Sequence, residues 1–168
     1  MLAHFAWQLM AVSTLATDPC DGFKWDVHAE RALFAQSPHI VVTGTTLKAA
    51  PTIAMDHLQQ LNLSAQSDVT FAAPPGDKKS VPGGYAGLVH FSTPSAGVYR
   101  ISADQPAWID VVAAGAVIAA KDLEGQKGCS APHKVVQFLL PASSDLVLQV
   151  SGAKLPAVKL ALTRAANP

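Results

Sequence analysis

The stretch VYRISADQPAWIDVVAAG, residues 98–115, contains two runs in which polar and apolar side chains alternate. Successive side chains of a β-strand point to opposite faces of a sheet, so each run is typical of a half-buried strand. Pro106 lies between the runs, where a proline removes no hydrogen-bond donor from a central ladder. The stretch therefore predicts two adjacent strands and their connection inside a β-sandwich.

Similar alternating runs occupy the rest of the C-terminal half. In one of them, Leu146 and Leu148 fall on one face and Gln149 on the other. Such short, evenly spaced strands, without amphipathic helices between them, predict an all-β sandwich or barrel and exclude a doubly wound α/β fold. The predicted strands cover residues 85–92, 97–103, 107–115, 116–122, 133–141, 145–152 and 157–164.

The N-terminal half adds one or two strands and a long loop. Residues 40–47 are predicted to be extended as far as Gly44. Residues 58–65 favour a strand, although their leucines fit neither the strand period nor the helical period cleanly. Residues 66–84 contain three prolines and three glycines, which predicts a loop. The sequence therefore predicts a two-sheet, jelly-roll-like sandwich of about eight or nine strands.

One short N-terminal helix is expected over residues 27–36. Asp26 can cap its first turn, because an aspartate at this position accepts a hydrogen bond from a free backbone N–H. The helical period places Glu30 and Arg31 on the solvent side and Ala29 on the inner side.

The composition fits a single compact domain, expected over residues 17–168. Of 168 residues, 49% are hydrophobic and 14% are charged, and twelve basic side chains balance twelve acidic ones. A net charge of zero without a basic run gives no electrostatic reason to expect nucleic acid or an anionic membrane as a partner.

Residues 1–16, MLAHFAWQLMAVSTLA, carry no formal charge and place an apolar core before small residues. This layout predicts a secretory signal peptide cleaved before Thr17, although His4 stands where a basic residue is usual. The alternative is a mature N-terminal helix. The apolar run is shorter than the ~20 residues that cross a bilayer, so no membrane span is expected in the mature chain. The expected location is periplasmic or secreted.

Cys20 and Cys129 are the two cysteines. An even count in an exported chain predicts a disulfide between them, and the alternative is two unrelated buried thiols. Their spacing excludes a CxxC redox pair or a zinc knuckle.

Residues 84–152 resemble the jelly-roll β-sandwich of bacterial pre-peptidase C-terminal domains and related accessory modules. The shared features are the strand around Phe91, the run AGVYRIS at 96–102, Asp110 within a hydrophobic strand, and LVLQVSG at 146–152. The resemblance implies a module that binds, solubilises or spaces its neighbours.

The segment CDGFKWDVHAERALF, residues 20–34, resembles the start of a set of short exported proteobacterial proteins after their signal peptide. Some of those proteins carry the label homogentisate 1,2-dioxygenase. That activity implies iron held by two histidines and a glutamate. No two histidines lie close together in this sequence, so its residues do not support the dioxygenase label.

No motif for catalysis or metal binding is present: the chain has no GxSxG, HxH or HExxH. We therefore predict no catalytic residues, no metal and no cofactor. The candidate ligand-binding residues are His90, Arg100 and Asp110, which would form a polar cluster if they share an exposed sheet face. Trp108 is predicted in the core, and Trp25 is predicted to pack the N-terminal segment onto the sandwich.

The sequence favours an exported, non-enzymatic binding or accessory module of the cell envelope, with an envelope protein or a carbohydrate as partner. One alternative is a small exported enzyme or metal-dependent protein. A further alternative is an inhibitor or chaperone-like domain that presents residues 72–84 to another protein.

Overall fold

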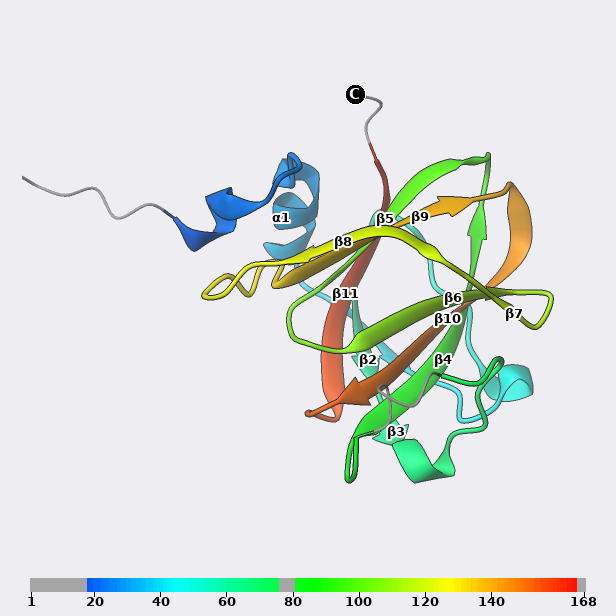
Figure 1. Cartoon of the computed structure of the whole chain (residues 1–168). Coiled ribbons are helices and arrows are strands. Elements are labelled where there is room, and N and C mark those ends of the chain that lie inside the picture. Colours follow the sequence, from blue (N-terminus) through cyan, green and yellow to red (C-terminus); the bar gives the residue numbers. More distant parts are fainter. Residues whose placement is uncertain (1–17, 76–80, 166–168) are drawn as a thin grey trace, which may run out of the picture.

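The computed structural model describes residues 18–75 and 81–165. Within these ranges the chain forms eleven strands in two sheets packed face to face, with one short α-helix (Figure 1). The predicted all-β two-sheet sandwich is confirmed. The predicted signal peptide, residues 1–16, lies outside the described residues.

We refer to the six-stranded sheet as sheet A and to the five-stranded one as sheet B. The strand order in sheet A is β1 (His39–Val42), β2 (Leu58–Asn62), β11 (Ala157–Arg164), β5 (Gly97–Ala103), β9 (Lys134–Leu140), β8 (Ala120–Gly125). The order in sheet B is β3 (Ser64–Ala65), β4 (Tyr85–Thr93), β10 (Ser143–Ala153), β6 (Trp108–Ala113), β7 (Ala116–Ile118). The helical elements are α1 (His28–Phe34) and three 3-10 turns, η1 (Pro19–Gly22), η2 (Leu47–Ala49) and η3 (Gln66–Asp68).

The strand count exceeds the prediction because two predicted strands pass from one sheet to the other. The predicted strand 58–65 is divided at Leu63 into β2 and β3, and the predicted strand 116–122 is divided at Ala119 into β7 and β8. A chain that changes sheets at a sandwich corner keeps its extended backbone but exchanges its hydrogen-bonding partners. Alternation in sequence continues through such a corner and does not reveal it.

The stretch 98–115 contributes to both sheets. Its first run forms part of β5, which pairs with β11 and β9, and its second run forms β6, which pairs with β10 and β7. The two strands are therefore consecutive in sequence but are not hydrogen-bonded neighbours. Residues 104–107, which include Pro106, cross between the sheets.

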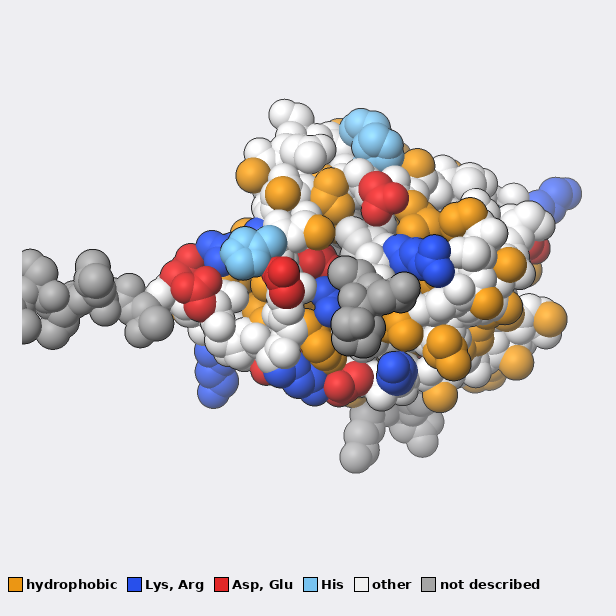
Figure 2. Space-filling view, turned by 90° about the horizontal axis from the view of Figure 1, so that it is seen from above, with side chains coloured by type: hydrophobic (Ala, Val, Ile, Leu, Met, Phe, Trp, Pro, Cys, Tyr) orange, Lys and Arg blue, Asp and Glu red, His pale blue; other side chains and the backbone are white. Residues whose placement is uncertain are grey.

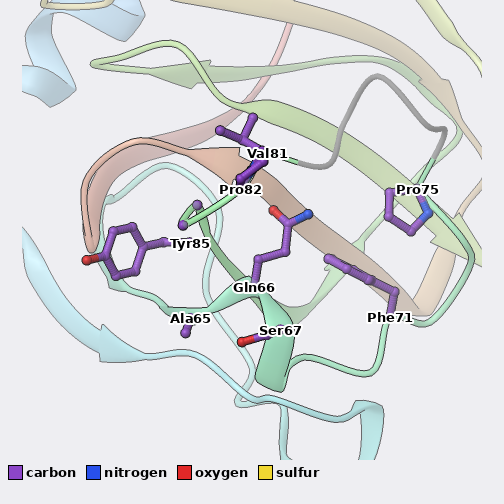
Figure 3. A pocket seen from close by; sticks show the side chains of 10 residues that line it. Ala65, Gln66, Ser67, Phe71, Pro75, Val81, Pro82 and Tyr85 are labelled. Carbon is purple, nitrogen blue, oxygen red and sulfur yellow. The ribbon is translucent and has the colours of Figure 1, made fainter.

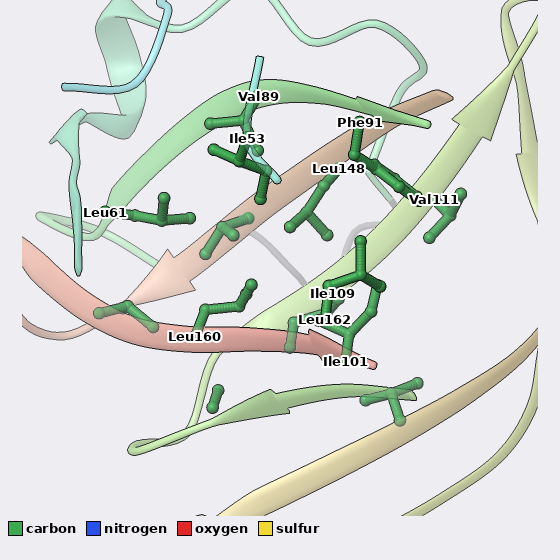
Figure 4. Close-up of a cluster of buried hydrophobic side chains, with 14 of the residues drawn as sticks. Ile53, Leu61, Val89, Phe91, Ile101, Ile109, Val111, Leu148, Leu160 and Leu162 are labelled. Atoms are coloured by element: carbon green, nitrogen blue, oxygen red, sulfur yellow. The ribbon is translucent and has the colours of Figure 1, made fainter. Parts of the chain in front are cut away.

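The core lies between the two sheets (Figure 4). On β4, β5, β6 and β10 the inward side chains are those that the alternation predicts. Ile53 also joins the core, although it lies outside every predicted strand. Figure 4 labels Ile53, Leu61, Val89, Phe91, Ile101, Ile109, Val111, Leu148, Leu160 and Leu162 in this cluster.

The outer face of sheet B, which points away from sheet A, is also covered. Gln149 projects from β10 on this face and is fully buried. Its Oε1 accepts a hydrogen bond from the Ala73 backbone N–H at 3.3 Å, and its Nε2 donates to the Ala73 carbonyl at 2.9 Å. The Gln149 amide thus helps to fix the described part of the predicted loop 66–84 on the sheet, where Val69 and Ala73 also pack.

Gly87 on β4 allows a close approach between the sheet and the chain that leaves β1. A Cβ atom at this position would lie 2.1 Å from Thr43 Oγ1, and that hydroxyl donates to the Asn62 carbonyl at 2.9 Å. We therefore expect Gly87→Ala to lower the free energy of unfolding by about 2 kcal/mol through overpacking. Urea unfolding measures the effect, and Gly125→Ala, whose Cβ would meet no atom closer than 3.5 Å, should change stability by less than about 0.5 kcal/mol. Equal effects of the two substitutions would contradict this account.

Candidate functional site

The three predicted ligand residues lie on opposite sides of the sandwich. Tyr99 and Ile101 face the core, so Arg100 projects from the outer face of sheet A. By the same argument from the core residues of β4 and β6, His90 and Asp110 project from the outer face of sheet B. The structure brings His90 and Asp110 to one face and does not bring Arg100 to them.

His90 links β4 to two neighbouring segments. Its Nδ1 lies 2.8 Å from Asp145 Oδ1, and its Nε2 lies 3.1 Å from the carbonyl oxygen of Leu47. In an Asp–His pair that activates a nucleophile, the second ring nitrogen faces a hydroxyl or a thiol. Here it faces a carbonyl, which can only accept a hydrogen bond. The geometry makes His90 a tether for η2.

Asp110 belongs to the buried outer layer of sheet B. It is only 5% exposed, and in the strand register it lies opposite Gln149 on β10. Its position next to the amide that fixes Ala73 places it within the packing of the sheet rather than on an exposed face.

Arg100 anchors the N-terminal clasp, the name we give to residues 18–34, which lie against the outer face of sheet A (Figure 1). Its Nη1 donates to the Asp26 carbonyl at 2.6 Å and to Glu30 Oε1 at 3.4 Å. The guanidinium also lies 5.6 Å from the centroid of the Trp25 ring. With the Gln137 amide oriented to accept, its oxygen receives Trp25 Nε1–H at 3.3 Å and Arg100 Nε–H at 3.2 Å. The predicted packing role of Trp25 is confirmed.

Glu30 is on the inner side of α1, and its prediction as a solvent residue is wrong. It is 2% exposed, and Oε1 also accepts the Thr163 hydroxyl at 3.0 Å. Ala29, predicted to face inward, is exposed. The helix is turned so that its carboxylate meets Arg100, because a buried anion needs a cation and hydrogen-bond donors. The helix is also shorter than predicted, His28–Phe34, although Asp26 Oδ1 does accept the His28 N–H at 2.9 Å.

A disulfide closes the clasp onto the sandwich. The predicted Cys20–Cys129 bond is confirmed, with an S–S distance of 2.02 Å. Cys129 packs in a small apolar cluster with Phe23, Val27 and Val135. Charged side chains of both signs surround this region (Figure 2).

Three carboxylates that belong to the clasp or contact it have pKa values below their ordinary value. The Cys20 N–H and then the Arg31 guanidinium lower the pKa of Asp18 below its ordinary value of 3.8. The backbone and then the side chain of His28 lower the pKa of Asp26, and the Lys24 ammonium, 2.8 Å away, lowers that of Asp122. Each of these groups favours the folded state in its ionised form.

We expect acid to weaken the clasp. Because the folded pKa values of Asp18, Asp26 and Asp122 lie below the unfolded ones, their contribution to stability is complete above about pH 4 and disappears as the pH falls through the folded values. Asp104, whose pKa is raised by burial, acts in the opposite sense. Urea unfolding between pH 7 and pH 2 measures the loss, which should be smaller in Asp18→Asn. An unchanged profile in that variant would contradict the assignment.

A groove of about 410 Å³ lies at one end of the sandwich, between the end of β8 and the start of β6. Trp108 lines it and is 39% exposed, so the prediction that this residue is in the core is wrong. The alternation around Trp108 correctly places Ile109 and Val111 in the core, but it does not show that the strand begins at the end of the sheet. The lining residues are Val81, Pro106, Ala107, Trp108, Leu123, Gly125, His133, Lys134, Gly152 and Lys154.

On β8, beside this groove, the side chain that faces inward is more exposed than its neighbours that face outward. Leu123 pairs with Val136, a core residue of β9, so it points to the inner side of sheet A. It is nevertheless 52% exposed, whereas the outward Asp122 and Glu124 are half-buried under Lys24 of the clasp. Sheet A therefore extends beyond sheet B here and leaves inner-facing apolar surface accessible in the groove.

The polar side chains of the groove are basic. Lys134 Nζ donates to the Ala107 carbonyl at 2.8 Å and lies 5.3 Å from the centroid of the Trp108 ring. His133 Nδ1 lies 3.2 Å from the Cys129 carbonyl, and the Lys154 side chain is exposed at the end of β10. None of these three residues stood out in the sequence, because Lys154 meets His133 and Lys134 at the groove only in the folded chain.

A second cavity, of about 590 Å³, lies beside β3 and the start of β4 (Figure 3). Gln66 lines it, but its Oε1 already accepts the Gly152 N–H at 2.6 Å. Pro75 and Val81, two further lining residues, flank residues 76–80, which the structure does not describe. We assign no ligand to this cavity.

Within residues 18–75 and 81–165, no three of the His, Cys, Asp and Glu side chains are grouped so that they could hold a metal ion. No helix in the described part of the chain has the length and apolar character to span a membrane. Comparison with protein-family models, curated proteins and solved structures found no match to this chain. The resemblances to pre-peptidase C-terminal domains and to short exported proteins therefore remain predictions.

Proposed function

We propose that this chain is an exported, non-enzymatic binding module whose ligand site is the groove at Trp108. The observation that carries the proposal is the reversed exposure of β8, where inner-facing Leu123 is accessible beside an exposed tryptophan. Apolar and aromatic surface in a concave site of roughly 300–1,000 Å³ is typical of small-molecule binding.

The disulfide supports export. Cys20–Cys129 joins residues 109 positions apart, and such bonds persist in oxidising compartments such as the periplasm or the extracellular space. Residues 1–16 have the layout of a signal peptide, which agrees with that location.

The lining of the groove supports binding over catalysis. Its ten described lining residues include no serine, threonine, cysteine or carboxylate, and the Lys134 ammonium already donates to the Ala107 carbonyl. Two described histidines have a carboxylate partner, and both lie outside the groove: His90 faces a carbonyl on the outer face of sheet B, and His28 pairs with Asp26 in the clasp. The described lining therefore lacks a hydroxyl or thiol nucleophile paired with a base.

Isothermal titration calorimetry with 2-naphthylmethanol, a neutral bicyclic probe, tests the proposal. We expect the full chain to bind this probe and Trp108→Ala to bind it at least tenfold more weakly, because a central aromatic platform commonly contributes about 2 kcal/mol or more. Leu123→Ala should also weaken binding. Leu139→Ala, which truncates an even more exposed leucine outside the groove, should not. Equal affinity for the wild type and Trp108→Ala would contradict the proposal.

A further inference from the structure

We propose that β1 is a dimerisation strand, which pairs antiparallel with β1 of a second copy of this chain. The inference does not depend on the groove at Trp108. Three observations carry it: the edge of sheet A at β1, the direction of the backbone groups of this strand and the apolar side chains beside them.

Sheet A ends at β1 in the part of the chain that the structure describes. β1 pairs with β2 on one side, and no described strand lies on its other side. An edge strand offers backbone N–H and C=O groups to a strand of another molecule, and proteins often protect such an edge with charged residues or proline. Residues 39–42, HIVV, contain no Lys, Arg, Asp, Glu or Pro. The edge at β1 therefore lacks both of these protections.

The register of β1 shows which backbone groups point to this edge. Alternate residues of a paired strand direct their N–H and C=O groups to the same neighbour. Thr43, directly after β1, donates its N–H to the Asn62 carbonyl of β2 at 3.1 Å. The backbone of Val41 therefore also faces β2, whereas Ile40 and Val42 direct their N–H and C=O groups away from it. Two donors and two acceptors thus lie along the edge.

The side chains of Ile40 and Val42 are apolar and exposed. Val41 packs against the core, so its two neighbours project from the outer face of sheet A, where Ile40 is 60% and Val42 is 73% exposed. Cross-strand pairs of β-branched side chains stabilise neighbouring strands. A second strand on this edge would cover both side chains as it binds the backbone.

A second copy of β1 matches these groups when the two-fold axis passes through Val41. Ile40 then lies opposite Val42 of the second copy, and both side chains are on the outer face. Each of the two such pairs exchanges two hydrogen bonds, because the backbone groups of both residues point to the edge. Val41 meets its own copy on the inner face. A two-fold axis of this kind closes the assembly at two copies.

Other registers of self-pairing are less favourable. An axis at Ile40 would place Pro38, which has no N–H, opposite Val42. An axis at Val42 would require Gly44, whose N–H and carbonyl are both bonded to Leu88 on β4. An axis between two residues would place an inward side chain opposite an outward one.

Charge also distinguishes β1 from the opposite edge of sheet A. Neither β1 nor its neighbour β2, LQQLN, contains a charged residue, so self-pairing brings no like charges together. On β8, an axis at Leu123 would place Asp122 opposite Glu124 of the second copy. In sheet B, the edge strands β3 and β7 have only two and three residues.

Sedimentation velocity of the full chain tests the proposal. A contact of two four-residue strands is small beside the ~1,200 Å² of a stable interface, so we expect a weak dimer with a dissociation constant on the order of 100 µM. The average mass should rise between about 5 and 500 µM. Ile40→Lys should weaken association at least about tenfold, because a lysine on the edge opposes pairing. Leu139→Lys, which changes an exposed leucine of β9, should leave association unchanged.

Hydrogen exchange identifies the strand. By mass action, the amides of Ile40 and Val42 should exchange about threefold more slowly at 500 µM than at 5 µM, whereas the amides of β7 should not change. A monomer at every concentration would overturn the proposal. A dimer that Ile40→Lys leaves intact, or one in which the Ile40 and Val42 amides exchange at the monomer rate, would also overturn it.

Discussion

Replacing Cys20 and Cys129 together by serine is expected to lower the free energy of unfolding by about 4 kcal/mol. The bond joins residues 109 positions apart, so its removal restores much conformational freedom to the unfolded chain. It also releases the N-terminal clasp from the sandwich at the end where Phe23 and Val27 pack. Urea unfolding of the oxidised wild type and of the double variant measures the difference.

Reduced wild type provides the control for this prediction. It should unfold at nearly the same urea concentration as Cys20→Ser/Cys129→Ser, because both lack the covalent link and keep the small apolar cluster. A difference of less than about 1 kcal/mol between the oxidised wild type and both of these forms would show that the clasp is held by its other contacts alone.

Arg100→Met is expected to lower the free energy of unfolding by about 3 kcal/mol. The substitution removes the cation that faces the carboxylate of Glu30, a residue only 2% exposed, and it removes a donor to the Asp26 carbonyl. Without Arg100 the buried carboxylate keeps the Thr163 hydroxyl but has no cation to offset the loss of its solvation. Equilibrium unfolding monitored by circular dichroism measures the loss.

A double-mutant cycle with Glu30→Gln tests the cause. The amide keeps an acceptor for the Thr163 hydroxyl but has no charge, so Arg100→Met should cost about 2 kcal/mol less in the Glu30→Gln background. Additive effects would contradict the ion pair as the cause. Affinity for 2-naphthylmethanol in Arg100→Met should stay within about twofold of wild type, whereas a loss of tenfold would assign Arg100 to ligand binding.

The alternation of side chains was enough to predict which residues form the core. It placed Ile109, Val111 and Leu148 correctly, because a β-strand with one face in the core must alternate whatever its neighbours are. The disulfide was also predictable, because an even number of cysteines in a chain with a predicted signal peptide favours a disulfide.

Two features were not predictable from the sequence: which strands pair, and which side chains of α1, β6 and β8 are buried or exposed. The chain changes sheets at Leu63 and Ala119 without any break in its extended pattern. Glu30 is buried because Arg100, 70 residues away, compensates its charge, and no local period contains that information. Leu123 is exposed because sheet A extends beyond sheet B, and Trp108 is exposed because it is the first residue of β6, on the side of the strand opposite Ile109. Both depend on the relative lengths and positions of the strands.

The central claim is that the groove at Trp108 is the ligand site. Intermolecular nuclear Overhauser effects between 2-naphthylmethanol and the isotope-labelled chain test it most directly. We expect effects from the naphthyl protons to the Leu123 methyl groups and to the Trp108 indole, which line the groove together. Effects confined to Ile40 and Val42, the exposed apolar side chains of β1, with none to Leu123 or Trp108, would contradict the claim.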